Sequence, residues 1–252
     1  MSDAFITDRT RFLKRPGKPD IAWRKTEGEG TGIIWLGGYA SDMAGTKADY
    51  LSSWARSMGR PYLRFDYSGH GESGGYFEDG CISDWADDAL CVLDQLTEGP
   101  QILIGSSMGG WITCLLARQR PERLAGLLFI APAPDFTDEL MWPSWDKATQ
   151  QRLLSEGKLE FPSEYDESVM IYTRRLYEDG KSASVFAQPL KVNVPVRILQ
   201  GMNDTSVPWQ HAARLAEHIE AGDLQITMIK GADHRMSGPA DLARLAQVLE
   251  SL

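Results

Sequence analysis

Cysteine is scarce in this sequence, and no group of residues has the spacing of a metal site. The 252 residues include three cysteines, Cys81, Cys91 and Cys114, without a Cys-x-x-Cys pair. An odd number of cysteines at such spacings indicates neither a disulfide framework nor a zinc site. A glycine-rich phosphate-binding loop is lacking as well. We therefore expect buried, reduced thiols in a cytoplasmic protein that works without a metal or another cofactor.

Long hydrophobic runs are lacking too, and basic residues are outnumbered. The longest apolar candidate, residues 124–134, falls well short of the ~20 residues that cross a bilayer. Residues 1–20 mix acidic and basic side chains without an apolar core, unlike a secretory signal or a transit peptide. The 26 Lys and Arg residues against 35 Asp and Glu residues give a net charge of −9. Because nucleic acids and anionic membranes select for basic patches, we expect neither a nucleic-acid partner nor stable membrane insertion.

Short apolar runs alternate with amphipathic stretches along most of the chain. Hydrophobic residues make up 42% and charged residues 24% of the sequence, as in an ordinary globular protein, and the length suits one large domain. Such alternation is typical of a mostly parallel sheet with helices on both faces, so the predicted fold class is α/β. Strands are expected at residues 32–36, 61–65, 101–105, 124–131, 195–200 and 224–230, and helices at 47–58, 82–96, 108–118, 209–219 and 241–252.

One long segment interrupts the alternation. Residues 132–186 contain no evident strand of the sheet but many aromatic and charged side chains. Because a long insertion in a compact domain is usually functional, we interpret it as a small, mostly helical cap over the carboxyl end of the sheet. Residues 1–131 and 187–252 then form the core domain. Five apolar cap residues either line a pocket for an acyl chain or pack the cap against the sheet. They are Phe136, Met141, Trp142, Trp145 and Met170.

The most informative motif is Gly-x-Ser-x-Gly, which runs from Gly105 to Gly109 with Ser107 at its centre. A strand is predicted before it and a helix after it, and this context is more specific than the five residues alone. In a strand–turn–helix elbow the serine hydroxyl stands above the edge of the sheet, and the helix N-terminus favours negative charge there. Flanking glycines are needed because a side chain would collide with the neighbouring elements. Ser107 is therefore the predicted nucleophile.

A serine nucleophile needs a base that takes its proton, and the sequence offers four histidines. His234 follows the last predicted strand, at the edge of the sheet from which an imidazole can reach the elbow. His211 and His218 are expected at the surface of a helix. His70 lies in a glycine-rich loop, where a structural or pocket-lining role is expected. His234 is therefore the predicted general base.

The acid of the predicted triad should lie between the serine and the histidine in the chain. Asp204 follows the strand that precedes His234 and so lies at the same edge of the sheet. We expect it to hold the correct tautomer of His234 and to stabilise the imidazolium. Asn203 and Asp233 are the nearby rivals, but Asp233 is adjacent to the histidine and should point elsewhere.

Two preorganised backbone amides are expected to bind the developing oxyanion. One belongs to Met108, the residue after the nucleophile. The other should come from the loop after the first strand of the sheet, where Gly37 and Gly38 let the backbone approach closely. The amide of Tyr39 is the best candidate in that loop. The alternative is that the two glycines form an ordinary tight turn.

These residues resemble the α/β-hydrolase superfamily over nearly the whole chain. Residues 37–48, 64–71 and 105–111 are similar to one branch, the abhydrolase-domain palmitoyl-protein thioesterases and mycophenolic acid acyl-glucuronide esterases. The phrase Gly-Tyr…Gly-Thr-Lys-Ala within residues 37–48 is far more specific than the serine motif. Animal members of that branch carry a mitochondrial leader, whereas this chain starts almost at the domain, as expected of a bacterial cytoplasmic relative. The resemblance implies hydrolysis of esters or thioesters through an acyl-serine intermediate.

Other reactions on the same scaffold remain alternatives to hydrolysis of a small-molecule or acyl-chain ester or thioester. Carbon–carbon bond hydrolysis and cofactor-free perhydrolysis use the same triad in this superfamily. A serine at the nucleophile position argues against haloalkane dehalogenases and epoxide hydrolases, which use an aspartate there. A non-catalytic ligand sensor would keep a pocket but would not need a complete triad. Ester or thioester hydrolysis is the predicted function.

Overall fold

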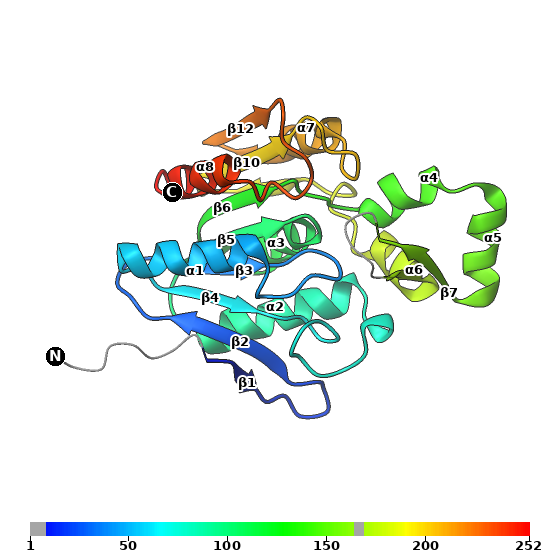
Figure 1. The fold of residues 1–252 in the computed structure, drawn as a ribbon, viewed down its shortest axis with the longest axis horizontal. Helices are drawn as coiled ribbons and strands as arrows, with labels where there is room; N and C mark the ends of the chain where they lie inside the picture. Colours follow the sequence, from blue (N-terminus) through cyan, green and yellow to red (C-terminus); the bar gives the residue numbers. More distant parts are fainter. Residues whose placement is uncertain (1–8, 164–168) are drawn as a thin grey trace.

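The computed structural model describes residues 9–163 and 169–252, with an eight-stranded sheet at its centre. The strand order is β1-β2-β4-β3-β5-β6-β10-β12. Neighbouring strands from β4 to β12 are parallel, and β1 and β2 are antiparallel at one edge. The carboxyl ends of the parallel strands therefore meet at one end of the sheet, and the insert (residues 132–163 and 169–186), which is the predicted cap, lies beyond that end (Figure 1). The strands are β1 (Arg11–Leu13), β2 (Ile21–Thr26), β3 (Gly32–Leu36), β4 (Tyr62–Phe65), β5 (Gln101–Ser106), β6 (Leu124–Ile130), β10 (Val196–Gly201) and β12 (Leu224–Ile229).

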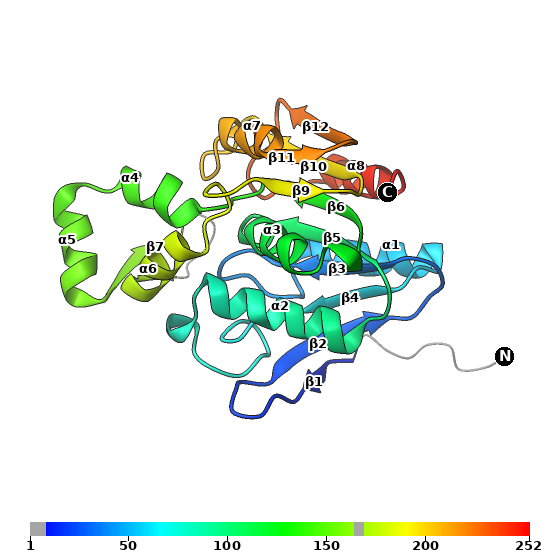
Figure 2. The same cartoon turned by 180° about the vertical axis from the view of Figure 1, so that it is seen from behind.

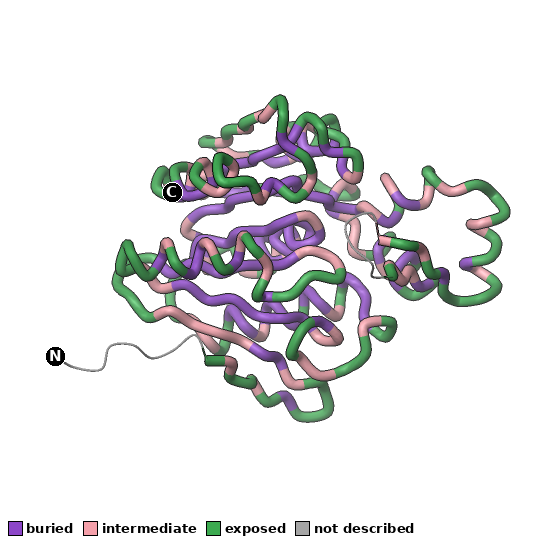
Figure 3. Tube along the Cα trace, in the orientation of Figure 1, coloured by how far each residue is buried: buried purple, intermediate pink, exposed green. Residues whose placement is uncertain are grey.

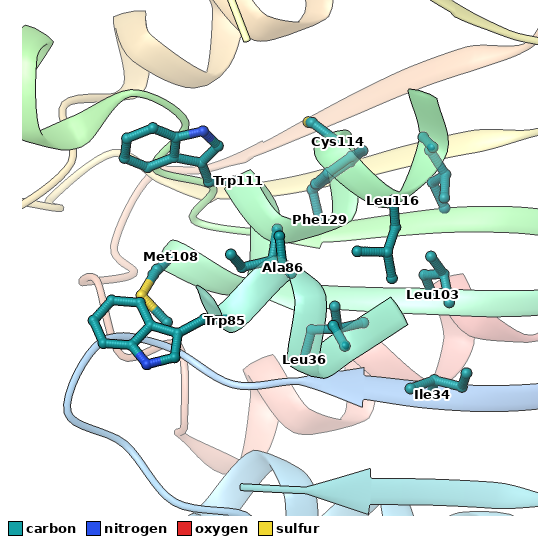
Figure 4. Close-up of a cluster of buried hydrophobic side chains, with 14 of the residues drawn as sticks. Ile34, Leu36, Trp85, Ala86, Leu103, Met108, Trp111, Cys114, Leu116 and Phe129 are labelled. Carbon is teal, nitrogen blue, oxygen red and sulfur yellow. The ribbon is translucent and has the colours of Figure 1, made fainter. Parts of the chain in front are cut away.

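Helices cover both faces of the sheet, as comparison of Figures 1 and 2 shows. Successive residues of a strand point to opposite faces, so a strand that is buried on both sides contributes side chains to two hydrophobic cores. In β3, Ile33 belongs to the hydrophobic cluster that includes Leu51 of α1, whereas Ile34 belongs to the cluster that includes Trp85 of α2. Part of the second cluster is drawn in Figure 4, and the burial of the central strands is visible in Figure 3. The helices are α1 (Thr46–Met58) and α8 (Pro239–Leu249) on one face, and α2 (Ile82–Leu96), α3 (Met108–Gln119) and α7 (Trp209–His218) on the other.

The predicted α/β class with a mostly parallel sheet is confirmed, whereas the insert holds more than helices. Its strands β7 and β8 form an antiparallel pair outside the central sheet. The sequence did not predict this pair because each strand has five residues and only one fully buried position. The insert has a small core of its own, in which Met141, Leu153, Leu159 and Tyr177 are buried. Its elements are the π-helical turn η3 (Thr137–Met141), α4 (Trp142–Ser144), α5 (Lys147–Glu156), β7 (Lys158–Pro162), β8 (Val169–Thr173) and α6 (Arg174–Ser182).

Four further strands were missed because they are short or lie at the edge of the sheet. β1 has three residues, and β2 is buried only at its first two positions. β9 (Leu190–Val192) and β11 (Ile219–Ala221) form a separate parallel pair. Short 3₁₀ turns lie at η1 (Phe77–Asp79) and η2 (Pro121–Arg123). Within residues 9–163 and 169–252, no helix has the length and apolar character that a membrane crossing requires.

Candidate active site

Ser107 lies on a sharp turn between β5 and α3. Its φ and ψ angles are 54° and −118°, and a positive φ is strained for a residue other than glycine. Hydrogen bonds hold the turn: the Ser107 amide donates to the carbonyl of Ile130 (2.9 Å), and the Ser107 carbonyl accepts from Gly110 (2.8 Å) and Ala133 (3.1 Å). The strained conformation is therefore fixed by β6 and by the start of α3. Such strain is typical of functional positions.

The two glycines of the motif are explained by close packing around this turn. A Cβ atom on Gly105 would lie 2.4 Å from Thr113 Oγ1, and one on Gly109 would lie 2.0 Å from the carbonyl oxygen of Leu36. Carbon and oxygen atoms cannot approach so closely without a shift of the backbone. Glycine at both positions therefore lets α3 pack against β3 while Ser107 keeps its place at the end of the sheet.

The structure brings Ser107, His234 and Asp204 into one chain of hydrogen bonds. His234 Nε2 lies 3.0 Å from Ser107 Oγ, and His234 Nδ1 lies 2.8 Å from Asp204 Oδ2. The serine follows β5, the aspartate follows β10 and the histidine follows β12, so the parallel register places all three at one end of the sheet. Both ring nitrogens of His234 therefore face the predicted partners. This is the geometry that proton transfer from a serine hydroxyl requires.

Asp204 is buried and its carboxylate is held in a fixed orientation. Oδ1 accepts hydrogen bonds from the backbone amides of Ser206 (3.0 Å) and Val207 (2.7 Å). Oδ2 accepts one from Gln200 Nε2 (3.1 Å) besides facing His234. These donors satisfy the buried charge, which would otherwise be costly. The sequence did not single out Gln200, because a polar residue inside a predicted strand gives no signal of its partner.

The rival carboxylate and two of the other histidines have contacts of their own. Asp233 Oδ1 accepts a hydrogen bond from the amide of Met236 (3.0 Å), which joins the two ends of the loop from Asp233 to Met236. His70 is buried, as a structural role predicts, and burial lowers its pKa to about 4. The expected surface position of His211 is wrong. Its Nε2 is 2.7 Å from the carbonyl oxygen of Pro134 in the buried interior, because α7 packs this face against the chain that follows β6.

The loop after β3 passes directly beside the nucleophile. A Cβ atom on Gly38 would lie 3.5 Å from Ser107 Cβ, so the backbone there is close to the serine side chain. Met108 is the first residue of α3, and amides in the first turn of a helix have no carbonyl acceptor within the helix. Ala40 has a φ of 53°, which turns the loop back just after Tyr39. Both predicted oxyanion donors therefore lie on backbone segments that adjoin Ser107.

Two charged residues at the end of β4 anchor this loop. Arg64 Nη1 donates to the carbonyl oxygen of Met43 (2.8 Å), and Asp66 Oδ1 accepts from the amide of Met43 (2.6 Å). Burial raises the pKa of Asp66 to about 6, although its hydrogen bonds from backbone amides favour the charged form. Residues 64–71 were assigned no role in the site from the sequence beyond their resemblance to the abhydrolase branch. Charged residues at the end of an apolar strand are the signal that could have marked Arg64 and Asp66 as supports of the site.

The side chain of Tyr39 joins the same loop to the insert. Its ring stacks on Tyr172 with a centroid distance of 5.6 Å and contacts Phe136 edge-on at 5.7 Å. Its hydroxyl donates to the backbone oxygen of Ile171 in β8. Burial raises the pKa of Tyr39 well above its usual value, so the hydroxyl stays protonated.

The apolar cap residues occupy different positions. The Trp142 ring stacks on Tyr177 at 3.9 Å, so it packs within the insert. Phe136 also contacts Trp111 of α3 at 5.7 Å and thus bridges the insert and the sheet domain. The other three predicted residues pack inside the insert or lie on its short sheet. Met141 is in the core of the insert, Trp145 stacks on Phe161, and Met170 of β8 pairs with Phe161 of β7.

Comparisons with known proteins find a family model, curated relatives and solved structures that are similar to this chain. Residues 33–248 match the model of a family described as the alpha/beta hydrolase family. The chain is 36% identical to the palmitoyl-protein thioesterase ABHD10, mitochondrial, of Bos taurus, over 96% of this chain and 79% of that protein. The human protein of the same name is 35% identical over the same shares. Among solved structures, a putative hydrolase from Agrobacterium vitis S4 superimposes with a TM-score of 0.92 at 41% identity, covering 96% of this chain and 98% of that one. Mouse alpha/beta hydrolase domain-containing protein 10 gives a TM-score of 0.90 at 34% identity, over 96% and 97% of the two chains.

Proposed function

The chain belongs to the alpha/beta hydrolase family, and we propose that it is a serine hydrolase that cleaves carboxylic esters or thioesters through an acyl-serine intermediate. The observation that carries this proposal is the hydrogen-bonded chain from Ser107 Oγ through the ring of His234 to Asp204. The relatives named palmitoyl-protein thioesterase support a thioester or ester substrate with an acyl chain.

In the first half of the reaction, Ser107 is acylated. His234 Nε2 takes the hydroxyl proton as Ser107 Oγ attacks the carbonyl carbon of the substrate, and Asp204 stabilises the imidazolium that forms. The amides of Met108 and Tyr39 donate to the oxygen that becomes negatively charged. His234 then gives its proton to the departing alkoxide or thiolate, so that an alcohol or a thiol leaves and the acyl group stays on Ser107.

In the second half, water replaces the serine. His234 takes a proton from the water molecule that attacks the acyl-serine carbonyl, and the same two amides hold the second tetrahedral intermediate. Collapse of this intermediate returns the proton to Ser107 Oγ and releases the carboxylic acid. Asp204 and its amide donors keep the imidazole ring oriented throughout both halves.

Phe136 is the cap residue we assign to the acyl side of the site. Its ring lies between Tyr39 of the predicted oxyanion loop and Trp111 of α3. Trp142 and Trp145 are assigned to the packing of the insert, because their ring contacts are with other residues of the insert. Residues 132–186 thus act as a cap, and Phe136 near its start carries the ring contact with the predicted oxyanion loop.

Matched oxyesters and thioesters, from acetyl to palmitoyl, test the proposal with the wild type and Ser107→Ala side by side. Replacement of Ser107 should lower kcat by several orders of magnitude while the fold is retained, since only binding and the oxyanion donors remain. Preference for long thioesters would identify an acyl-protein or acyl-CoA deacylase, and preference for short or bulky oxyesters a carboxylesterase. Residual activity within tenfold of the wild type would reject Ser107 as the nucleophile. Failure of the whole series, with cleavage of a carbon–carbon bond or formation of a peracid from a carboxylic acid and hydrogen peroxide, would favour the alternative reactions.

A reducing compartment such as the cytoplasm is part of the proposal. The three cysteines are free thiols in the structure, and Cys81 and Cys114 are buried. The related mammalian proteins are named mitochondrial. Fractionation of cells that express the tagged full chain distinguishes the two locations.

A further inference from the structure

Lys47 connects the start of α1 to the loop that carries His234. It is the second residue of α1 and comes just after the loop that adjoins Ser107. Its Nζ donates to the backbone oxygen of Arg235, at 2.5 Å, across 188 residues of sequence. Arg235 directly follows His234, so this hydrogen bond holds the backbone next to the histidine.

The loop around His234 is held on its other side by the segment after β10. The amide of Asn203 donates to the carbonyl oxygen of Ala232 at 2.9 Å, two residues before His234. Beyond the histidine, Met236 has a φ of 44°, a conformation that is unfavourable for a residue other than glycine. A strained loop keeps its shape only where its surroundings over-determine it. The Lys47 hydrogen bond lies between His234 and the strained residue.

Burial and nearby charges set the protonation state in which Lys47 makes this hydrogen bond. The side chain is half-buried and faces the cation of Arg235 and the carboxylates of Asp233 and Asp241. Burial, reinforced by Arg235, lowers the pKa of Lys47 to about 8, and the two carboxylates oppose that change. The ammonium group is therefore charged at neutral pH and loses its proton in mildly alkaline solution.

We propose that Lys47 is a positioning residue that fixes the imidazole of His234 by holding the backbone of the following residue. This inference rests on the proposed role of His234 as the general base. The hydrogen bond from Lys47 also gives the Gly-Thr-Lys-Ala motif at residues 45–48 a structural role. The chain from Gly38 to Lys47 forms the loop beside Ser107. Through the Lys47 hydrogen bond it also holds the loop that carries His234.

The test compares Lys47→Met, which keeps the length of the side chain and removes its charge and donors, with Lys191→Met. Lys191 is an exposed lysine of β9 that pairs with Glu220 and does not touch the site. Lys47→Met should lower kcat on a short ester on the order of tenfold or more with KM little changed, because a small misplacement of a catalytic group costs rate rather than binding. Lys191→Met should match the wild type. If Lys47→Met does not fold, Lys47→Gln replaces it in both measurements.

A second readout does not depend on turnover. The proton on His234 Nδ1, in its hydrogen bond to Asp204, gives a far-downfield proton resonance that His234→Gln lacks. Lys47→Met should shift or broaden this resonance, whereas Lys191→Met should leave it as in the wild type. An unmoved resonance together with an unchanged kcat would overturn the positioning role. Because the resonance is measured on the free protein, this result is separate from failure of Ser107→Ala to abolish activity, which would overturn the proposed function instead.

Discussion

His70 illustrates how burial changes the pKa of a histidine that lies outside the proposed catalytic residues. Its ring packs edge-on against Phe77 at 4.9 Å and Trp85 at 5.1 Å, and Nδ1 lies 3.2 Å from the carbonyl oxygen of Ser68. Loss of hydration lowers its pKa from 6.5 to about 4, so the ring is neutral in the folded protein. His234 instead lies beside the end of the sheet with a partner at each ring nitrogen.

The lowered pKa of His70 predicts how the free energy of unfolding depends on pH. The folded pKa of His70 lies below its unfolded value, so between pH 6.5 and about 4 the unfolded chain binds a proton that the folded chain does not. The stabilisation present above pH 6.5 is therefore lost as the pH falls. Urea unfolding at pH 7 and pH 4.5 should show a smaller loss of unfolding free energy in His70→Gln than in the wild type, by about 2–3 kcal/mol. Equal losses in the two proteins would contradict a buried neutral His70.

At the residue scale, the hydrogen-bonded chain of Ser107, His234 and Asp204 is predictable, whereas the environment of single side chains is not. Ser107, Asp204 and His234 each follow an apolar strand, and parallel pairing brings the ends of such strands together. His211 was expected at the surface because the sequence shows only the face of its own helix. Its partner, the carbonyl of Pro134, comes from a segment 77 residues away, and no local pattern marks that contact.

At the scale of elements, the contact between α3 and β3 decides whether the elbow can form. Gly109 lies where the first turn of α3 crosses the end of β3, and an added Cβ would lie 2.0 Å from the carbonyl oxygen of Leu36. Gly222, which follows β11, has no atom within 4 Å of the corresponding position. An added methyl group therefore collides with the backbone at Gly109 and has open space at Gly222.

Gly109→Ala should disturb the elbow, and Gly222→Ala is the matched control. The added methyl must push α3 away from β3, so we expect a loss of unfolding free energy of about 2 kcal/mol or more and a drop in kcat through displacement of Ser107. Gly222→Ala should stay within about 0.5 kcal/mol of the wild type with its activity unchanged. Chemical denaturation and turnover of a short ester measure both effects. Similar behaviour of the two variants would show that the contact with Leu36 is not what fixes the elbow.

The elements with strong periodicity were predicted, and the short ones were not. The buried strands β3 to β6 and β10 read as apolar runs because both of their faces are covered. The edge strand β12 was predicted from its apolar residues, although it has no fully buried position. β7 and β8 form a two-stranded sheet of their own, and each has one fully buried position, so their burial pattern is weak. The antiparallel pair is stabilised by the small core of the insert rather than by the central sheet.

At the scale of the whole molecule, the insert is fixed at its root and along one side. The buried Asp135 accepts from the amides of Val185 (2.7 Å) and Phe186 (3.1 Å), which ties the start of the insert to its end. Along its side, Asp179 of α6 accepts from the amide of Ser83 in the first turn of α2 at 2.9 Å. An acidic side chain is favourable at a helix N-terminus.

Asp179→Ala should loosen the side of the insert without unfolding the sheet domain. The substitution removes the half-buried acceptor of the Ser83 amide, so we expect a change in global unfolding free energy of about 1 kcal/mol or less and faster limited proteolysis of the insert. Glu156→Ala is the control, because Glu156 pairs with Arg152 inside the insert and does not reach α2. Equal cleavage rates in the variant, the control and the wild type would contradict the role of the Asp179 contact.

The proposed mechanism requires that Ser107 Oγ becomes acylated. Mixing the protein with a slowly deacylated activated ester, quenching, and measuring the mass of the intact chain and its peptides tests this directly. In the wild type we predict the mass of a single acyl group, located on Ser107 and removed with time, and no such adduct in Ser107→Ala. An acyl group on a different residue, or equal turnover in Ser107→Ala and the wild type, would show that Ser107 is not the nucleophile.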